Sequence, residues 1–319
     1  MNEKQIKKQL RRTYSKTGVA LLVYYILMNV AVMAVCAIEV VTKVFFQGNG
    51  TEEEVYAALS ESLMNNGWGY LIAILLGWLL AIAWKKADFC FHEIWKTERG
   101  MTSGSFWRLL VLFLGTQGLL QVWVILVETS LNMLGLSAIS AIESASGGAD
   151  TISMFLYVCL GAPIAEEILF RGLLLRSLKP YGKGFAIFAT AFLFGIFHGN
   201  LVQTPFAFLV GLILGYVALE YSIGWAMVLH MINNLVLGDT LPRLFSILGG
   251  IGDGLLNLVI WGCTIAGIVI LCVKREMIRR FFRENRMHPW CVKSFFASPG
   301  VIVLTVLMIV SMAMGITAL

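Results

Sequence analysis

Charged residues are scarce in this sequence. They make up 13% of the 319 residues, whereas an average soluble domain has roughly 25%. Hydrophobic residues make up 58%, and the mean hydropathy is +0.81. This composition predicts a multi-pass membrane protein. The net charge of +5 does not indicate nucleic-acid binding, because the basic residues fall in short segments between apolar runs, as topology determinants do. We therefore expect no nucleic-acid partner.

The sequence also lacks any C-x-x-C pair and any H-E-x-x-H motif. Four of its cysteines lie in apolar runs and two in basic loops: Cys36, Cys159, Cys263, Cys272, Cys90 and Cys291. These absences argue against a disulfide framework and a thiolate zinc site. The cysteines are instead expected to be small apolar packing residues.

Long apolar runs dominate what is present. At about 20 residues per span, they predict an all-α polytopic transmembrane bundle of eight or nine membrane helices. The expected spans lie near residues 17–41, 68–84, 105–134, 151–178, 184–202, 204–221, 223–238, 254–273 and 295–317. The first run is too long for a signal-peptide core and has no small-residue cleavage site, so we interpret it as a retained signal anchor. The segment 47–67 is the best candidate for a mobile outer loop.

The loops alternate between basic and acidic composition. Basic residues gather in 1–16, 85–99, 179–183 and 274–293, whereas the intervening loops are acidic and hold only Lys43 and Arg243 as cations. The positive-inside rule then predicts a cytoplasmic N-terminus and, with nine spans, an outer C-terminus. The lack of long loops and appended soluble domains favours a protein of a bacterial plasma membrane.

Ionisable and amide side chains interrupt three of the apolar runs: Glu166, Glu167, Arg171, His198, His230 and Asn234. A charge at the bilayer centre costs roughly 2.5–3.5 kcal/mol, so several near one depth predict a protein-lined, hydrated working site. Residues four apart share a helix face. Glu167 can therefore form an ion pair with Arg171 and leave Glu166 as a free base, while His230 and Asn234 address one small volume.

The rise of a helix per residue gives the expected depth of each side chain in the membrane. Glu166, His198 and Asn234 are expected roughly 16–21 Å from the inner boundary, and His230 only roughly 10 Å from it. The helix that carries His230 is therefore expected to tilt, or to begin deeper in the membrane than the span 223–238 implies.

These groups suit hydrolysis of an amide. A carboxylate with an imidazole can deprotonate water, while a second imidazole and a carboxamide donate to the oxyanion of the tetrahedral intermediate. Glu166, His198 and His230 could instead hold a catalytic zinc ion, although no H-E-x-x-H places two imidazoles on one helix. The metal-free and the zinc-assisted routes both stay open.

The same residues resemble the three signature motifs of the CPBP intramembrane proteases over about residues 154–238. The motifs are E-E-x-x-x-R at Glu166, Glu167 and Arg171, F-x-x-x-H at Phe194 and His198, and H-x-x-x-N at His230 and Asn234. That family includes type II CAAX prenyl endopeptidases and bacterial bacteriocin-processing and self-immunity (Abi) proteins. The resemblance implies a helical membrane peptidase in which Glu166 and His198 activate water and His230 and Asn234 stabilise the oxyanion. It does not decide whether a metal is used.

On this interpretation the chain has three parts. Residues 1–150 supply three N-terminal membrane helices that brace the core or gate access, 151–240 form the catalytic core, and 241–319 supply C-terminal helices with a basic cytoplasmic loop. The expected partners are the lipid bilayer and a membrane-associated or lipid-adjacent peptide, either of the CAAX type or a bacteriocin or other peptide precursor.

Three rival interpretations remain. The carboxylates could merely form a buried ion-pair network with Arg171 and Arg176. A proton-coupled transporter also uses intramembrane Glu and His, but it would be expected to show inverted repeats and broken helices, which the sequence does not suggest. A non-catalytic immunity or scaffold protein could use the same fold to bind a partner, and the intact motifs argue against that role.

Overall fold

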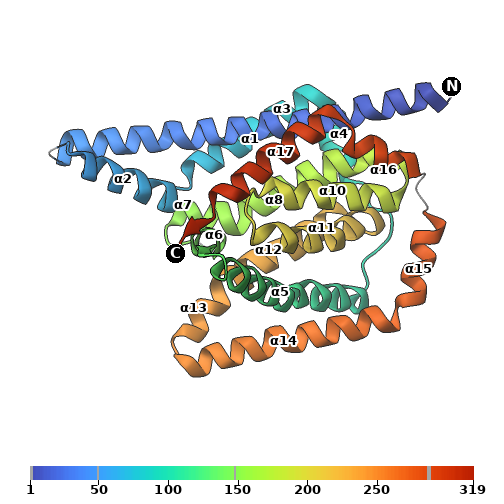
Figure 1. Cartoon of the computed structure of the whole chain (residues 1–319). Helices are drawn as coiled ribbons and strands as arrows, with labels where there is room; N and C mark the ends of the chain where they lie inside the picture. Colours follow the sequence, from blue (N-terminus) through green and yellow to red (C-terminus); the bar gives the residue numbers. More distant parts are fainter. Residues whose placement is uncertain (1–2, 49, 147–148, 286–288) are drawn as a thin grey trace.

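The computed structural model describes residues 3–48, 50–146, 149–285 and 289–319, and these are almost entirely helical. Within them, the sheet consists of two short strands, β1 (Leu136–Ser137) and β2 (Thr317–Ala318), paired antiparallel. The predicted all-α bundle is confirmed (Figure 1). Part of the predicted inner segment 274–293, namely 286–288, lies outside the described residues.

The helices follow one another along the chain with short connections. The α-helices are α1 (Glu3–Gln47), α2 (Glu52–Asn65), α3 (Trp68–Lys85), α4 (Ala87–Phe91), α5 (Ser103–Asn132), α6 (Ile139–Ser146), α7 (Ile152–Phe155), α8 (Ala162–Glu166), α9 (Arg176–Leu178), α10 (Lys183–Phe197), α11 (Gln203–Glu220), α12 (Ile223–Ile232), α13 (Leu241–Ser246), α14 (Gly250–Val273), α15 (Arg275–Glu284), α16 (Pro289–Phe296) and α17 (Pro299–Met314). Two 3₁₀ turns are η1 (Glu93–Trp95) and η4 (Lys179–Tyr181), and three π-helical segments are η2 (Leu156–Gly161), η3 (Glu167–Leu175) and η5 (Asn233–Thr240).

Six helices are long and apolar enough to cross a membrane within the described residues, or seven if the bent pair α16–α17 is one span. Eight or nine were expected. The difference lies in two predicted spans that are helical but short: α10 has 15 residues, and α12 has 10 before it continues as π-helix. Each of the nine predicted apolar runs therefore coincides with helix, but not each is a full-length span.

The predicted outer loop 47–67 is instead largely helical. Thr51 and Glu54 form a capping box at the start of α2, in which the Thr51 hydroxyl accepts from the Glu54 amide. Glu39 on α1 then accepts hydrogen bonds from Ser62 and Asn66, each at 2.6 Å. The capping box satisfies the first free amides of α2 and so starts the helix. The hydrogen bonds to Glu39 hold α2 against α1, and the two helices form a hairpin.

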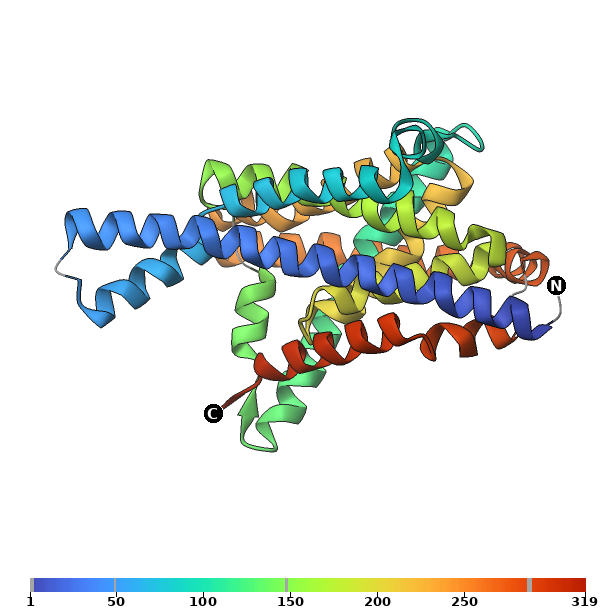
Figure 2. The ribbon, with the colours of Figure 1, turned by 90° about the horizontal axis from the view of Figure 1, so that it is seen from above.

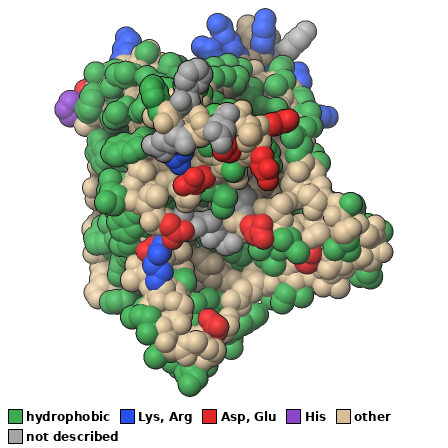
Figure 3. Space-filling view, turned by 90° about the vertical axis from the view of Figure 1, so that its left-hand side faces the viewer, with side chains coloured by type: hydrophobic (Ala, Val, Ile, Leu, Met, Phe, Trp, Pro, Cys, Tyr) green, Lys and Arg blue, Asp and Glu red, His purple; other side chains and the backbone are tan. Residues whose placement is uncertain are grey.

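Basic and acidic segments lie at opposite ends of the bundle. The N-terminus, α15 and α16 lie at one end, and the C-terminus, α6 and the α13–α14 junction at the other (Figures 1 and 2). Acidic side chains gather on the second end (Figure 3). There the cation Arg243 pairs with Asp150 at 2.8 Å and with Asp239 at 2.7 Å. The sequence-based division of the loops into two sets agrees with this arrangement, whereas the cytoplasmic N-terminus stays a prediction.

Close helix packing builds the core around α10, α11 and η3. A Cβ on Gly211 of α11 would lie 3.0 Å from the Ala191 Cα of α10, and one on Gly195 would lie 2.8 Å from the Thr204 carbonyl oxygen. Small residues thus let α10 and α11 approach closely, as in other membrane helix pairs. This packing places the C-terminal end of α10, where His198 lies, in the interior of the bundle.

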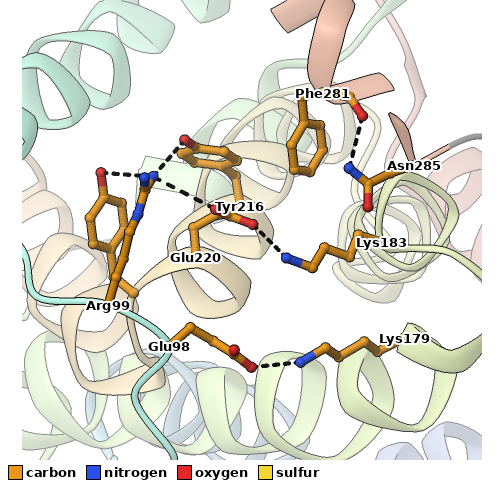
Figure 4. A network of polar contacts seen from close by, with 9 residues as sticks. Glu98, Arg99, Lys179, Lys183, Tyr216, Glu220, Phe281 and Asn285 are labelled. Carbon is orange, nitrogen blue, oxygen red and sulfur yellow. Dashed lines mark hydrogen bonds and ion pairs between the residues drawn. The ribbon is translucent and has the colours of Figure 1, made fainter. Parts of the chain in front are cut away.

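A network of polar contacts connects the segment before α5, η4, α10 and α11 at the basic end of the bundle (Figure 4). The Glu98 carboxylate accepts from Lys179 at 2.6 Å, and Glu220 accepts from Lys183 at 2.9 Å. Arg99 donates to the Tyr216 hydroxyl at 3.1 Å. These contacts join the segment before α5 to η4 and α11, and join α10 to α11. The Glu98 amide also donates to the Tyr221 carbonyl next to the start of α12.

Candidate active site

The motif glutamates lie where an α-helix changes to a π-helix. Pro163 lies in the first turn of α8, which continues the π-helix η2 without a break, and α8 ends at Glu166. Glu167 begins the π-helix η3. Such segments are uncommon and are frequent at functional sites. The apolar pattern predicts regular α-helix here, because it does not distinguish an α-helix from a π-helix.

Glu167 and Arg171 form the predicted ion pair. Glu167 Oε1 lies 3.0 Å from Arg171 Nη1, and both side chains are completely buried. A buried charge needs a partner of opposite sign, because water no longer stabilises it. The pairing therefore makes it possible for this carboxylate to stay ionised inside the bundle.

His230 lies between the two glutamates. Its Nδ1 is 2.9 Å from Glu167 Oε1, and its Nε2 is 3.7 Å from Glu166 Oε2. An ionised carboxylate only accepts, so the Glu167 contact assigns a proton to Nδ1 and points Nε2 toward Glu166. Glu166 keeps 23% of its side chain exposed, whereas Glu167 is buried. The shallow position expected for His230 is not a barrier to contact, since α12 brings it into direct reach of both carboxylates.

His198 follows the last residue of α10, and its ring orientation is set locally. Its Nδ1 lies 2.8 Å from the carbonyl oxygen of Phe194, and because a carbonyl only accepts, Nδ1 carries the hydrogen and Nε2 remains a base. The ring also lies within electrostatic range of Glu166, His230 and Arg171. The two predicted histidines and the predicted base thus converge from three helices.

Phe194 is a shared contact of these groups. Its ring packs edge-to-face against His198, with centroids 4.9 Å apart, and against His230 at 5.9 Å. The Arg171 guanidinium lies over the same ring, 4.2 Å from its centroid. The phenylalanine of the F-x-x-x-H motif therefore orients both imidazoles and contributes a cation–π contact to the buried arginine.

Asn234 belongs to a chain of carboxamides. Its Nδ2 donates to the Val158 carbonyl at 2.9 Å, and its Oδ1 accepts from Asn233 at 3.0 Å. Gln117 of α5 donates in turn to Asn233 at 2.9 Å. One of the two Nδ2 hydrogens of Asn234 is thus engaged in binding η2, and the other is the one that a substrate can use. The motif pattern predicted Asn234 but neither Asn233 nor Gln117, because neither of these two lies at a motif position.

Two tyrosines near Glu166 were also missed. Tyr24 of α1 and Tyr157 of η2 both lie within electrostatic range of the Glu166 carboxylate. The Tyr24 ring stacks on Phe197, next to His198, with centroids 6.1 Å apart. No spacing rule links Tyr24 to a motif more than a hundred residues later, and its one sequence signal is a phenol within an apolar run.

The three residues that could have held zinc, Glu166, His198 and His230, do not form a metal-binding group in the part of the chain that the structure describes. Throughout the ranges that the structure describes, no three or more His, Cys, Asp or Glu side chains are placed to hold a metal ion. Glu166, His198 and His230 come together as neighbours but not as a ligand set. We therefore derive no step through a metal.

The segment that contains these residues is similar to a known protein family. Residues 148–236 match the family model described as type II CAAX prenyl endopeptidase Rce1-like. The matched segment is less than a third of the chain and contains all of the motif residues. No curated protein and no solved structure matches the chain.

Proposed function

We propose that this chain is an intramembrane endopeptidase. The premise is that residues 148–236 are a domain of the CPBP family of CAAX-type proteases. The apolar helices place it in a membrane. The substrate proposed is a membrane-associated or lipid-adjacent peptide, either a CAAX-type peptide or a peptide precursor such as a bacteriocin leader.

One observation carries the proposal. His230 is held on Nδ1 by Glu167, which is itself neutralised by Arg171, while Nε2 faces Glu166 across 3.7 Å. A purely structural ion-pair network would need Glu167 and Arg171 alone. The arrangement instead adds a second, partly exposed carboxylate and a second imidazole, and intramembrane ionisable groups without a structural partner indicate function.

The mechanism proposed uses one carboxylate as base and the other as support. Glu166, assisted by His198 Nε2, takes a proton from water, and the resulting hydroxide attacks the peptide carbonyl carbon. His230, held through Nδ1 by Glu167, and the free Nδ2 hydrogen of Asn234 donate to the oxyanion. Glu166 then passes its proton to the amide nitrogen, the C–N bond breaks, and an amine and a carboxylic acid leave.

The test measures peptide cleavage by the purified full-length chain. The protein in detergent is incubated with a library of membrane-anchored peptides, and the products are identified by mass spectrometry. Glu166→Gln and His198→Ala should each lower the rate by about a hundred-fold or more, as expected for loss of a general base. Glu53→Gln, an exposed carboxylate on α2, is the matched control and should leave the rate unchanged.

Cleavage that survives both site substitutions would contradict the mechanism. A parallel incubation with a chelator, followed by added zinc, separates the two routes: loss and recovery of activity would assign the chemistry to a metal-assisted peptidase. A wild-type protein that cleaves no peptide but binds one tightly would favour the scaffold role instead.

A further inference from the structure

A large groove borders the catalytic residues, since Tyr24 and Ala165 are among its lining residues. A groove of about 980 Å³ runs between α1, α3 and the α8–η3 segment. Apolar side chains from these three elements line it, among them Val19, Val23, Leu80 and Ile164. Each of these four is between 37% and 48% exposed, so the groove opens sideways on the surface that faces lipid. Its volume is at the upper end of the roughly 300–1,000 Å³ typical of ligand pockets.

The groove becomes cationic at one end. Arg11, Arg12 and Lys16 line this end together with Ser15, and all three cations are exposed. No acidic side chain lines the groove among the described residues. Arg11 Nη2 donates to the Ala297 carbonyl at 3.0 Å, which holds one guanidinium at the mouth.

The junction of α16 and α17 completes this mouth. The two helices meet at an angle of 59°, and Ala297 and Pro299 at the bend line the groove. The 16-residue helix α17 starts at Pro299, so its positive dipole end adds to the three cations. The α16–α17 pair lies beside the basic part of α1 in both ribbon views (Figures 1 and 2).

We propose that this groove binds an anionic phospholipid, with an acyl chain along the apolar walls and the phosphate at Arg11, Arg12 and Lys16. Charge complementarity selects the occupant, since guanidinium groups bind phosphate oxygens in a bidentate manner. The sideways opening selects a lipid over a soluble anion. The mouth also lies at the basic end of the bundle, which the positive-inside rule assigns to the leaflet rich in anionic lipids. This proposal does not depend on the catalytic one.

The test is lipid retention by the full-length protein, followed by native mass spectrometry. The protein in mild detergent is titrated with phosphatidylglycerol and, separately, with phosphatidylcholine of the same acyl chains. Wild-type protein should retain phosphatidylglycerol about ten-fold better. The triple variant Arg11→Gln, Arg12→Gln, Lys16→Gln should lose that preference.

A matched triple variant controls for net charge. Arg275→Gln, Arg280→Gln and Arg283→Gln remove three cations from α15 at the same end but outside the groove, and the preference should survive. A further variant, Ala20→Trp, keeps the mouth and fills the groove beside α1, and it should lower retention of phosphatidylglycerol about ten-fold as well. Thermal unfolding of each variant in detergent confirms that it is folded, and Ala20→Trp decides the question if the first triple variant is not.

Four outcomes would overturn the proposal. Equal retention of both lipids by the wild type would show that the mouth selects no charge. An equal loss of preference in both triple variants would show attraction by net charge alone. Displacement of phosphatidylglycerol by excess inorganic phosphate would show that only the phosphate is bound, at a surface site. Unchanged retention of phosphatidylglycerol by Ala20→Trp would show that no acyl chain lies in the groove.

Discussion

His230 Nδ1 and Arg171 Nη1 contact the same oxygen, Oε1 of Glu167, at 2.9 and 3.0 Å. This shared atom connects a buried cation to a ring whose other nitrogen faces Glu166. The two adjacent glutamates therefore differ in their surroundings, because Glu167 is buried and paired while Glu166 keeps 23% of its side chain exposed.

The first prediction tests this difference by matched substitutions. Glu167→Gln leaves Arg171 buried without a counter-charge and should lower the free energy of unfolding by about 3 kcal/mol. Glu166→Gln removes a partly exposed carboxylate and should abolish cleavage with little change in unfolding. Thermal unfolding and cleavage rates in the same detergent measure both effects. Equal destabilisation by the two changes would show that Glu166 is structural.

The second prediction concerns the ring that contacts both histidines. Phe194→Leu removes the cation–π contact with Arg171 and the support of His198 and His230, so it should cost about 1 kcal/mol in stability. Displaced imidazoles should also lower kcat roughly ten-fold. The control is Phe188→Leu, since Phe188 packs edge-to-face on Phe208 outside the site. A fall in kcat that is equal in both variants would refute a specific role for Phe194.

The third prediction tests the contribution of α1 to the site. A Cβ on Gly77 of α3 would overlap the ring of Tyr24, so Gly77→Ala should push that ring away from its place near Glu166. We expect kcat to fall by roughly ten-fold or more. Gly262→Ala is the control, because nothing lies within 4 Å of its added Cβ.

Double substitution shows whether the effect acts through the tyrosine. If it does, Gly77→Ala should have no further effect in a Tyr24→Ala background, since the ring that it displaces is gone. Additive losses in the double variant would instead place the effect of Gly77 in the packing of α3 on α1.

The fourth prediction concerns pH and the network at the basic end. The hydrogen bond from Lys179 lowers the pKa of Glu98 below its ordinary value of 4.5. The folded-state pKa is thus below the unfolded one, so the contribution to stability is present above pH 4.5 and is lost as pH falls through the folded pKa. Because the pair is partly exposed, it contributes at most about 0.5 kcal/mol.

Unfolding curves of wild type and Glu98→Gln at several pH values measure this difference. The curves should differ near neutral pH and converge in acid, and Lys179→Met should behave like Glu98→Gln. A difference that persists unchanged at the lowest pH would mean that Glu98 stabilises the fold without its charge.

Local sequence determined the membrane embedding, the helical class and several site residues. Apolar runs and short charged loops suffice for the first two, because the cost of burying charge or bare backbone in lipid acts on each segment independently. The spacing predicted the Glu167–Arg171 pair, since residues four apart are neighbours on a helix, and the π-helical form of η3 keeps the two side chains in contact.

Tertiary packing decided the rest. The contact of His230 with Glu167 joins positions 63 residues apart, the Asn234 amide donates to a carbonyl of another element, and Tyr24 stacks on Phe197 from a helix outside the matched segment. The helix in 47–67 follows instead from a local capping box of Thr51 and Glu54. The apolar pattern also did not predict the π-helical turns or the lengths of α10 and α12. None of the tertiary contacts follows from periodicity, because each depends on which surfaces meet across the bundle and on the hydrogen bonds that only that meeting supplies.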